Sequence, residues 1–348
     1  MKKLKVGIIG AGPSGLTCGY YLARLGYQVD IYEAEKRAGG VMTFGIPDYR
    51  LPPDILEREI HNIERAGVNI ILNTKVGKDI SFSALRKKYD AVFIGIGAQK
   101  ALTLGLPGEE LEGVYHGLDF LKRHYLERDL DFTGKKVAII GGGNTAIDSA
   151  RTAIRLNARE VTILYRRNRE DMPADKMEIK DALEEGVKLR TLVNPVEFLG
   201  VNGKLRYIVI MKQTLGAFDE SGRRRAVPSG ETIIEDFDVV IAAISQKPDT
   251  EFLKGKVDLN RDRVKADRYS QATSMPGVFV GGDAHRGPED IVNAVCEAKK
   301  AAVQTSTIPM SRLTPERCSR AGSREPHQAA NTVSRTRKTI TNGWTLTA

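Results

Sequence analysis

The chain is poor in cysteine and aromatic residues, and it has no apolar run long enough to span a membrane. Its 348 residues include 3 Cys, 1 Trp and 6% aromatic residues. Three single Cys cannot form a disulfide framework, which fits a reducing, cytoplasmic setting. The sequence offers no C-x-x-C pair and no cluster of Cys, His or carboxylates at metal-ligand spacing, so we predict no redox disulfide and no metal site. Apolar runs fall short of the roughly 18–20 residues of a membrane span, so no membrane partner is expected.

The formal net charge of +9 is concentrated at one end of the chain. Residues 305–348 hold 14 Ser/Thr and 7 Lys/Arg against 2 Asp/Glu, without an apolar period, and they account for +5 of the total. We predict that they form a disordered, solvated tail. A disturbed reading frame is a second explanation for the abrupt change in composition. Because only +4 remains elsewhere, the nucleic-acid binding that a basic chain can indicate is not expected.

Glycine is enriched, with 34 residues or about 10% against a usual value of about 7%, and it marks two similar segments. In the first, Lys5–Glu33, a strand leads through Gly10-x-Gly12-x-x-Gly15 into a helix and a second strand. These glycines permit a tight turn, approach of the backbone to a pyrophosphate, and close packing of helix on strand. Glu33 would accept hydrogen bonds from a ribose diol. A glycine turn that merely joins strand to helix is the alternative.

The second segment, Lys136–Arg166, repeats this plan with Gly141-x-Gly143-x-x-Ala146. Ala is an accepted variant of the third position. Where the first segment has Glu33, the second has Arg166 and Arg167, and paired guanidinium groups would bind a 2′-phosphate that a carboxylate would repel. The first site therefore suits FAD and the second suits NADPH. A solvated basic patch is the alternative for the arginine pair.

Further elements fit around these two units. We expect buried strands over 89–98, 238–244 and 275–283, a helix near 289–303, crossovers between domains near 105–115 and 246–252, and hairpins over 201–232 that turn at Gly203, Gly216, Gly222 and Gly230. Asp283 follows Gly281 and Gly282 at the end of the last strand. In a flavoprotein its carboxylate would hold ribityl hydroxyls, with the N-terminus of the next helix near the flavin N1–C2=O edge. An ordinary helix-capping Asp is the alternative.

The combination of motifs resembles the NADPH-dependent flavoprotein (small, or β) subunit of glutamate synthase and its relatives, with a pyridine nucleotide-disulfide oxidoreductase-like fold. Those relatives include the flavin halves of dihydropyrimidine dehydrogenase and of NADH-dependent ferredoxin:NADP oxidoreductase. The resemblance covers roughly residues 3–304. The matching segments are 39–52, 93–98, 141–148, 165–167 and 281–283.

The resemblance implies an α/β fold with two Rossmann-like dinucleotide-binding domains, the NADPH domain inserted into the FAD domain. We predict an FAD domain over 1–106 and 250–304 and an NADPH domain over 107–249. The FAD site would comprise Gly10, Gly12, Pro13, Ser14, Gly15, Glu33, Gly40, Val41, Arg50, Val76, Gly97, Asp283 and Ile291. The NADPH site would comprise Gly141, Gly143, Asn144, Thr145, Arg166 and Arg167.

The implied activity is transfer of hydride from NADPH to FAD, followed by passage of electrons to an acceptor on a partner. That partner would be the glutamate synthase large subunit, in glutamate biosynthesis, or an iron–sulfur or ferredoxin protein. Because the cofactors supply the reactivity, we predict no catalytic acid–base residue.

Two features depart from the family pattern. Its members usually carry an N-terminal Cys-rich domain with two 4Fe–4S clusters, whereas this sequence begins at the flavin-binding strand, so any iron–sulfur relay is expected on another polypeptide. The sequence after residue 304 resembles nothing in the family. Two alternatives stay open: a ferredoxin:NADP oxidoreductase-type electron-transfer subunit, and a non-catalytic dinucleotide-sensing flavoprotein.

Overall fold

The computed structural model describes residues 4–220 and 222–307. The predicted tail therefore lies almost wholly outside the described residues. Its first three residues belong to helix α9 (Ile291–Thr307), so the helix extends past the predicted boundary at 304.

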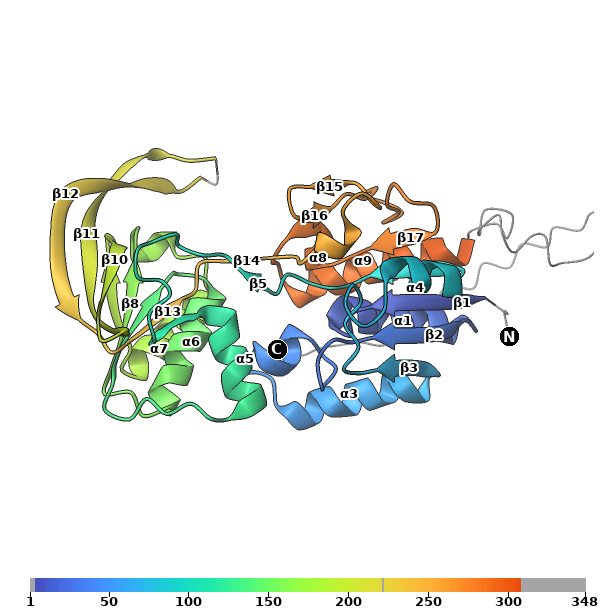
Figure 1. The fold of residues 1–348 in the computed structure, drawn as a ribbon, viewed down its shortest axis with the longest axis horizontal. Coiled ribbons are helices and arrows are strands. Elements are labelled where there is room, and N and C mark those ends of the chain that lie inside the picture. The colour runs from blue at the N-terminus through green and yellow to red at the C-terminus, as the bar shows by residue number, and fades with distance from the viewer. Residues whose placement is uncertain (1–3, 221, 308–348) are drawn as a thin grey trace, which may run out of the picture. The chain divides into compact units, whose positions relative to one another are not determined.

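The first sheet combines both ends of the described chain (Figure 1). Its strands are parallel and follow the order β17-β4-β1-β2-β3. Their bounds are β1 (Lys5–Ile9), β2 (Gln28–Tyr32), β3 (Val68–Ile71), β4 (Ala91–Ile94) and β17 (Val278–Val280). All of β4 and all of β1 except Lys5 are buried, as is typical of a parallel sheet covered on both faces. The chain leaves β1 toward β2 and later returns on the other side to β4, and ligands of such sheets bind at this reversal, beyond the carboxyl ends of the strands.

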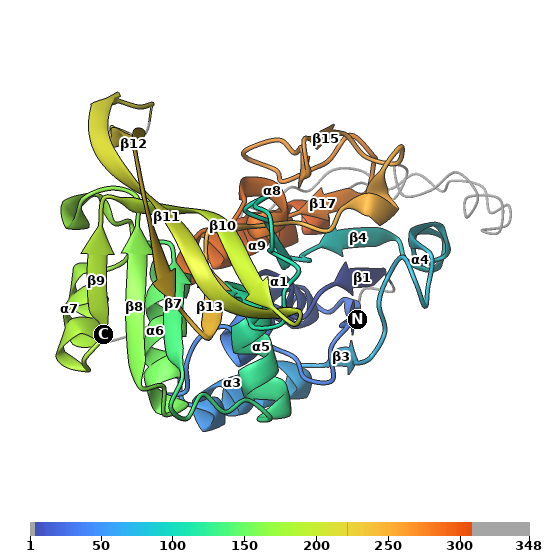
Figure 2. The same cartoon turned by 60° about the vertical axis from the view of Figure 1, so that its left-hand side comes forward.

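A second parallel sheet follows the order β6-β13-β7-β8-β9. Its strands are β6 (Val114–His116), β7 (Lys136–Ile140), β8 (Glu160–Tyr165), β9 (Lys188–Thr191) and β13 (Val239–Ala242). Its reversal lies between β7 and β13. Figure 2 shows β7, β8 and β9 side by side. The two predicted β-α-β units and the α/β class with two Rossmann-like sheets are thus confirmed, and the predicted strands are found, most of them shorter at their ends.

The helices follow the amphipathic pattern that covers such sheets. In the segments that build the first sheet they are α1 (Pro13–Arg24), α2 (Val41–Phe44), α3 (Pro53–Arg65), α4 (Phe82–Lys88), α8 (Asp283–Arg286) and α9. Between β6 and β9 they are α5 (Gly117–Glu127), α6 (Asn144–Arg155) and α7 (Lys176–Glu184), with short 3-10 turns at Arg169–Asp171 and, later, Glu251–Leu253. Helix α1 packs against α9. Separate buried apolar clusters lie around α1 and α9 and around α5 and α6.

The predicted hairpins form a three-stranded antiparallel sheet, β10-β11-β12. Only two of the four glycines predicted to form its turns lie between strands. The strands are β10 (Val193–Val201), β11 (Lys204–Phe218) and β12 (Arg224–Asp236). Gly203 and Gly222 lie in the connections, whereas Gly216 lies within β11 and Gly230 within β12. Both strand glycines adjoin register shifts, so they accommodate irregularities of a long ribbon rather than end it.

Short strands accompany the two connections between the sheets. Strand β5 (Lys100–Ala101) pairs with β14 (Gln246–Lys247) in antiparallel register. The first predicted crossover, 105–115, overlaps the connection from β4 to β6, and the second, 246–252, lies in the connection from β13 to β17. One more pair, β15 (Leu259–Asn260) and β16 (Arg263–Val264), precedes β17.

Candidate functional site

The three glycines of the first turn have different roles. The fold leaves no room for a side chain at two of them, and the third borders open space. Gly10 has φ +96°, and a Cβ there would lie 2.4 Å from the Gly95 carbonyl oxygen. A Cβ on Gly15 would lie 1.9 Å from the Gly10 carbonyl oxygen. Around Gly12, which precedes α1, a Cβ would meet nothing within 4 Å. The open space at the N-terminus of α1 is where a pyrophosphate would approach free backbone N–H groups.

Ser14 adds a polar group that lacks a partner. Its hydroxyl oxygen is buried and makes no hydrogen bond with any other described residue. Buried polar groups are nearly always paired, so an orphan hydroxyl at a helix N-terminus fits an absent acceptor such as a phosphate oxygen. Residues 9–14, apart from Ala11, line the same cavity, so the glycine turn and Ser14 face one space.

Glu33 is held rigidly beside this turn. Its side chain is 4% exposed, Oε2 accepts a hydrogen bond from Ala11 N at 2.7 Å, and Oε1 accepts one from Glu35 N at 2.9 Å. Burial raises the pKa of the Glu33 carboxyl, and the two backbone hydrogen bonds oppose that rise. Each oxygen keeps acceptor capacity for a further donor, as a ribose diol would require.

One cavity of about 840 Å³ brings most of the predicted residues together. Every residue of the predicted FAD set except Gly15 lines it: Gly10, Gly12, Pro13, Ser14, Glu33, Gly40, Val41, Arg50, Val76, Gly97, Asp283 and Ile291. From the predicted NADPH set, Asn144 and Thr145 line it. Gly141, Gly143, Arg166 and Arg167 do not line it. The cavity therefore extends from the carboxyl end of the first sheet to the N-terminus of α6.

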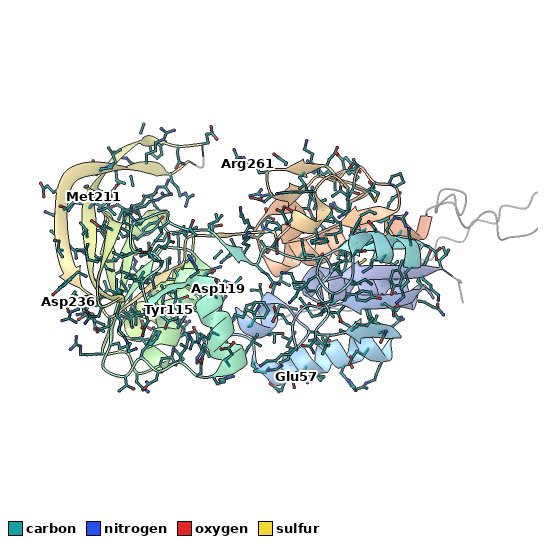
Figure 3. The ribbon with its side chains drawn as sticks, in the orientation of Figure 1. Glu57, Tyr115, Asp119, Met211, Asp236 and Arg261 are labelled. Carbon is teal, nitrogen blue, oxygen red and sulfur yellow. The ribbon has the colours of Figure 1, made fainter. Side chains whose placement is uncertain are left out.

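Helix α5 contributes to the cavity without any signal in the sequence. Leu118, Asp119 and Lys122 line it, and Figure 3 labels Asp119 on this helix. The ammonium of Lys122 lies 5.3 Å from the centroid of the Phe44 ring and forms an ion pair with Glu35. The motifs gave no reason to expect α5, because it carries no glycine turn.

Asp283 lies just beyond the last strand of the first sheet: β17 ends at Val280, and Asp283 begins α8 instead of ending the strand as predicted. The residue that precedes α8 is Gly282, and no side chain caps this helix, so Asp283 is not an ordinary N-cap. Its carboxyl accepts only a long hydrogen bond, at 3.4 Å, from Glu289 N. Burial raises the pKa of Asp283 to about 6, and the neighbouring carboxylates of Glu289, Glu297 and Asp290 raise it further.

This pKa predicts how stability depends on pH. A carboxyl whose pKa is higher in the folded chain than its ordinary 3.8 binds its proton more tightly there. Its stabilising contribution is thus present below about pH 4 and lost as the pH rises through 6. In flavin-free protein we expect the wild type to lose about 1–2 kcal/mol more of its free energy of unfolding than Asp283→Asn between about pH 4.5 and 7, a value reduced for partial exposure. Urea unfolding at both pH values measures this, and an equal loss in both proteins would contradict it.

The second glycine turn repeats the geometry of the first. Gly141 has φ +139°, and a Cβ there would lie 2.2 Å from the Ala243 carbonyl oxygen and 3.5 Å from the Ala146 Cβ. Ala146, at the third position, is fully buried, so only a small side chain fits there. Around Gly143, immediately before α6, a Cβ would meet nothing within 4 Å.

The structure separates the two arginines that the sequence treats as a pair. Arg166 is exposed and makes no ion pair or hydrogen bond with another described side chain. Arg167 is 6% exposed, forms an ion pair with Asp219, and donates from Nε to the Arg224 carbonyl oxygen at 2.7 Å. Its guanidinium thus anchors the β11–β12 connection to the end of β8. Asp219 lies far away in the sequence, so no local pattern could have predicted this use of Arg167.

No metal site and no disulfide is found in the part of the chain that the structure describes. Within 4–220 and 222–307, no group of His, Cys, Asp or Glu could hold a metal ion. The two cysteines of these residues are free: Cys18 is buried, which raises the pKa of its thiol, and Cys296 is exposed. None of the described helices is both long and apolar enough to cross a membrane.

Two parallel sheets, each with a glycine turn at its reversal, define the two-dinucleotide class of α/β folds. Solved structures with this fold include FprA of Mycobacterium tuberculosis in complex with NADPH, with a TM-score of 0.76, 19% identity, and coverage of 88% of this chain and 84% of that one. Thioredoxin reductase of Lactococcus lactis matches with a TM-score of 0.69, 22% identity, and coverage of 87% and 98%. At these identities the comparison shows the fold alone.

Residues 4–298 match the family model described as pyridine nucleotide-disulphide oxidoreductase, and the chain belongs to this family. Relatives include the β subunit of NADP(+)-dependent formate dehydrogenase of Moorella thermoacetica, 45% identical over 86% of this chain and 43% of that protein. The putative NADPH glutamate synthase small chain of Cereibacter sphaeroides is 40% identical over 85% and 75%. The corresponding small chain of Escherichia coli is 38% identical over 86% and 67%. The predicted resemblance is confirmed, and the chain spans about half the length of the first curated relatives it matches.

Proposed function

We propose that the chain is an FAD-dependent oxidoreductase that oxidises NADPH and passes the electrons to an acceptor on a partner. The observation that carries this proposal is the single cavity lined both by the first glycine turn and by Asn144 and Thr145 at the start of α6. A cavity that reaches from the first glycine turn to the start of α6 allows the redox groups of two nucleotides to meet. When bound, FAD would supply the chemistry, since it accepts a hydride and can release electrons singly.

The residues of the first turn fit FAD. The open space at Gly12 and the orphan hydroxyl of Ser14 suit a diphosphate, and the buried carboxylate of Glu33 suits an adenosine ribose. The Asp283 carboxyl, next to the start of α9, would accept hydrogen bonds from ribityl hydroxyls. The chain's own contribution is to bind and orient, and no side chain is assigned a proton-transfer step.

The residues of the second turn fit NADPH less completely. The space at Gly143 and the N-terminus of α6 suit its diphosphate. Of the predicted guanidinium pair, Arg166 is the one available for a 2′-phosphate, because Arg167 is held by Asp219.

The proposed acceptor lies on another polypeptide or domain. Several relatives are named as subunits, among them a subunit β of NADPH-Fe(3+) oxidoreductase from Geobacter sulfurreducens, of which this chain covers 49%. The described residues contain no metal-binding group that could relay single electrons. We therefore propose an iron–sulfur acceptor on a partner, either the glutamate synthase large subunit or a ferredoxin-type protein.

Purified protein is expected to be yellow and to hold FAD. Anaerobic NADPH should bleach the flavin absorbance faster than the same concentration of NADH. Protein that takes up no FAD contradicts the proposal, and flavin that binds both nucleotides without being reduced indicates a dinucleotide sensor instead. Affinity capture followed by electron-transfer assays with the captured protein would then separate a glutamate synthase large subunit from a ferredoxin.

A further inference from the structure

Two consecutive residues of the loop between α2 and α3 insert into the face of α6 and α7. Tyr49 and Arg50 belong to the segments that build the first sheet, and α6 follows the second glycine turn. We call these two residues the Tyr49–Arg50 clasp. It is a direct polar connection between the two nucleotide-binding halves, and it adjoins the shared cavity because Arg50 lines that cavity.

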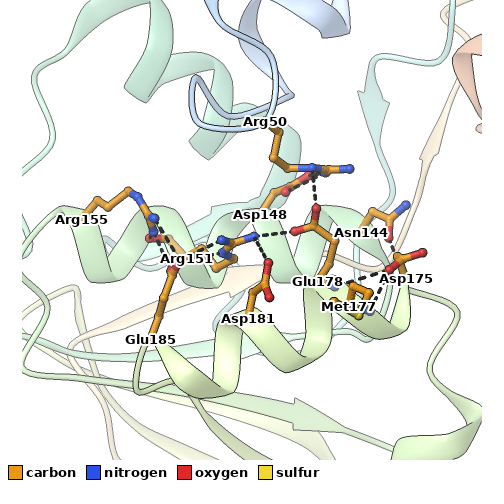
Figure 4. Close-up of polar contacts among 10 residues, drawn as sticks. All are labelled: Arg50, Asn144, Asp148, Arg151, Arg155, Asp175, Met177, Glu178, Asp181 and Glu185. Atoms are coloured by element: carbon orange, nitrogen blue, oxygen red, sulfur yellow. Dashed lines mark hydrogen bonds and ion pairs between the residues drawn. The ribbon is translucent and has the colours of Figure 1, made fainter. Parts of the chain in front are cut away.

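The Arg50 guanidinium is held by two carboxylates, one from each helix (Figure 4). Its Nη1 donates to both Oδ1 and Oδ2 of Asp148 on α6, each at 2.9 Å. Its Nε lies 3.0 Å from Oε1 of Glu178 on α7. Because the two carboxylates bind different nitrogens of one planar guanidinium, the Arg50 side chain has little rotational freedom.

Tyr49 fixes the other side of the clasp. The guanidinium carbons of Arg151 and Arg155 lie 4.4 Å and 4.1 Å from the centroid of its ring. Glu185 in turn holds both arginines, at 2.8 Å and 2.7 Å. Cation–π contacts of this kind orient a ring as well as bind it, so the loop is restrained at two adjacent positions.

Asp148 depends on this clasp. Its side chain is 6% exposed, and burial raises its pKa to about 6 even though the Arg50 guanidinium lowers it. Arg151 and Glu178 are the other charged groups nearby. A buried carboxylate that loses its partner is strongly unfavourable. The contact between Arg50 and Asp148 therefore fixes the position of α6 relative to the loop between α2 and α3.

Asp148 also lies close to the predicted NADPH contacts on the same helix. It follows Asn144 by four residues and Thr145 by three, so the three side chains share one side of α6. All three line the cavity. A shift of Asp148 relative to Arg50 would consequently shift the start of α6 relative to the first glycine turn.

We propose that Asp148 is a positioning residue that, through Arg50, sets the approach of the nicotinamide nucleotide to the flavin. This inference rests on the proposed function and adds a residue to it. A misplacement of about 1 Å between reacting groups can reduce a rate on the order of 100-fold. The effect should fall on the transfer step, because Asp148 belongs to neither glycine turn and the diphosphate sites remain intact.

The test uses Asp148→Asn, with Glu231→Gln on β12 as the control for replacing an exposed, ion-paired carboxylate by an amide. We expect wild-type FAD content and a Kd for NADP+ within about threefold of wild type. The rate of flavin reduction at saturating NADPH, measured by anaerobic stopped flow, should fall about 10- to 100-fold. Asp148→Glu, which keeps the carboxylate, should recover part of that rate, and Glu231→Gln should match wild type.

If Asp148→Asn does not fold, Glu178→Gln serves the same purpose, because Glu178 is more exposed and contacts Arg50 through one carboxylate oxygen, whereas Asp148 uses both. It should show the same division between rate and affinity with a smaller fall. An unchanged reduction rate in the variants would overturn the inference, and so would an equal fall in rate and NADP+ affinity. Failure of the proposed function is distinguishable, because wild-type protein would then lack FAD or remain oxidised with NADPH.

Discussion

Gly12→Ala is expected to abolish FAD binding while leaving the flavin-free protein as stable as wild type. Gly12 has φ −77° and an extended ψ of −177°, which Ala adopts without strain, and its Cβ would meet no protein atom within 4 Å. The methyl group would instead occupy the space into which the diphosphate must come. The free energy of unfolding should change by less than about 0.5 kcal/mol, while the molar ratio of FAD to protein falls to background.

Gly15→Ala is the matched comparison, since the same methyl group would meet the Gly10 carbonyl oxygen at 1.9 Å. Backbone must move to admit it, so this variant should lose about 1–3 kcal/mol as well as FAD. Flavin absorbance of the purified variants and urea unfolding of their flavin-free forms provide both readouts. Retention of FAD by Gly12→Ala would show that the diphosphate does not approach this turn.

Arg166→Gln is expected to raise KM for NADPH about 10- to 100-fold and to change KM for NADH by less than about twofold. A charge-assisted hydrogen bond contributes about 1.5–3 kcal/mol, and only NADPH carries the 2′-phosphate that would accept it. Steady-state assays with an artificial acceptor measure both constants. A similar loss with both nucleotides would mean that Arg166 has a structural role.

Arg167→Gln should behave differently from its neighbour. Removing the guanidinium deletes the ion pair between Arg167 and Asp219 and the hydrogen bond from Arg167 Nε to the Arg224 carbonyl oxygen. We expect a loss on the order of 2–3 kcal/mol in the free energy of unfolding, below the range for fully buried pairs because Asp219 is partly exposed. Discrimination between NADPH and NADH should change less than in Arg166→Gln.

Sequence reasoning succeeded where a local pattern carries a three-dimensional constraint. The spacing of Gly10, Gly12 and Gly15 prescribes a strand, a turn and a helix, and all three are present. Ala146, which the motif allows at its third position, lies in α6 and is fully buried. Asp283 follows the last strand of the first sheet, but that strand ends at Val280, and Asp283 is the first residue of α8 rather than the end of a strand.

It failed where the deciding partner lies far along the chain. Arg167 is paired by a residue in the β11–β12 connection, and Arg50 is paired by Asp148 and Glu178, so neither environment is encoded nearby. Helices α3, α5 and α7 were not predicted, since nothing but their apolar period announces them. Gly216 and Gly230 look like turn residues in sequence, yet the long β11–β12 ribbon continues through both.

The position of β17 in the first sheet has a consequence for the order in which the chain is made. Synthesis proceeds from the N-terminus, and domains generally fold as units as they emerge. The second sheet has all its strands once β13 has been translated, whereas the first still lacks β17 and Asp283. The half predicted to bind NADPH therefore has all the strands of its sheet on the ribosome while the half predicted to bind FAD still awaits its last strand.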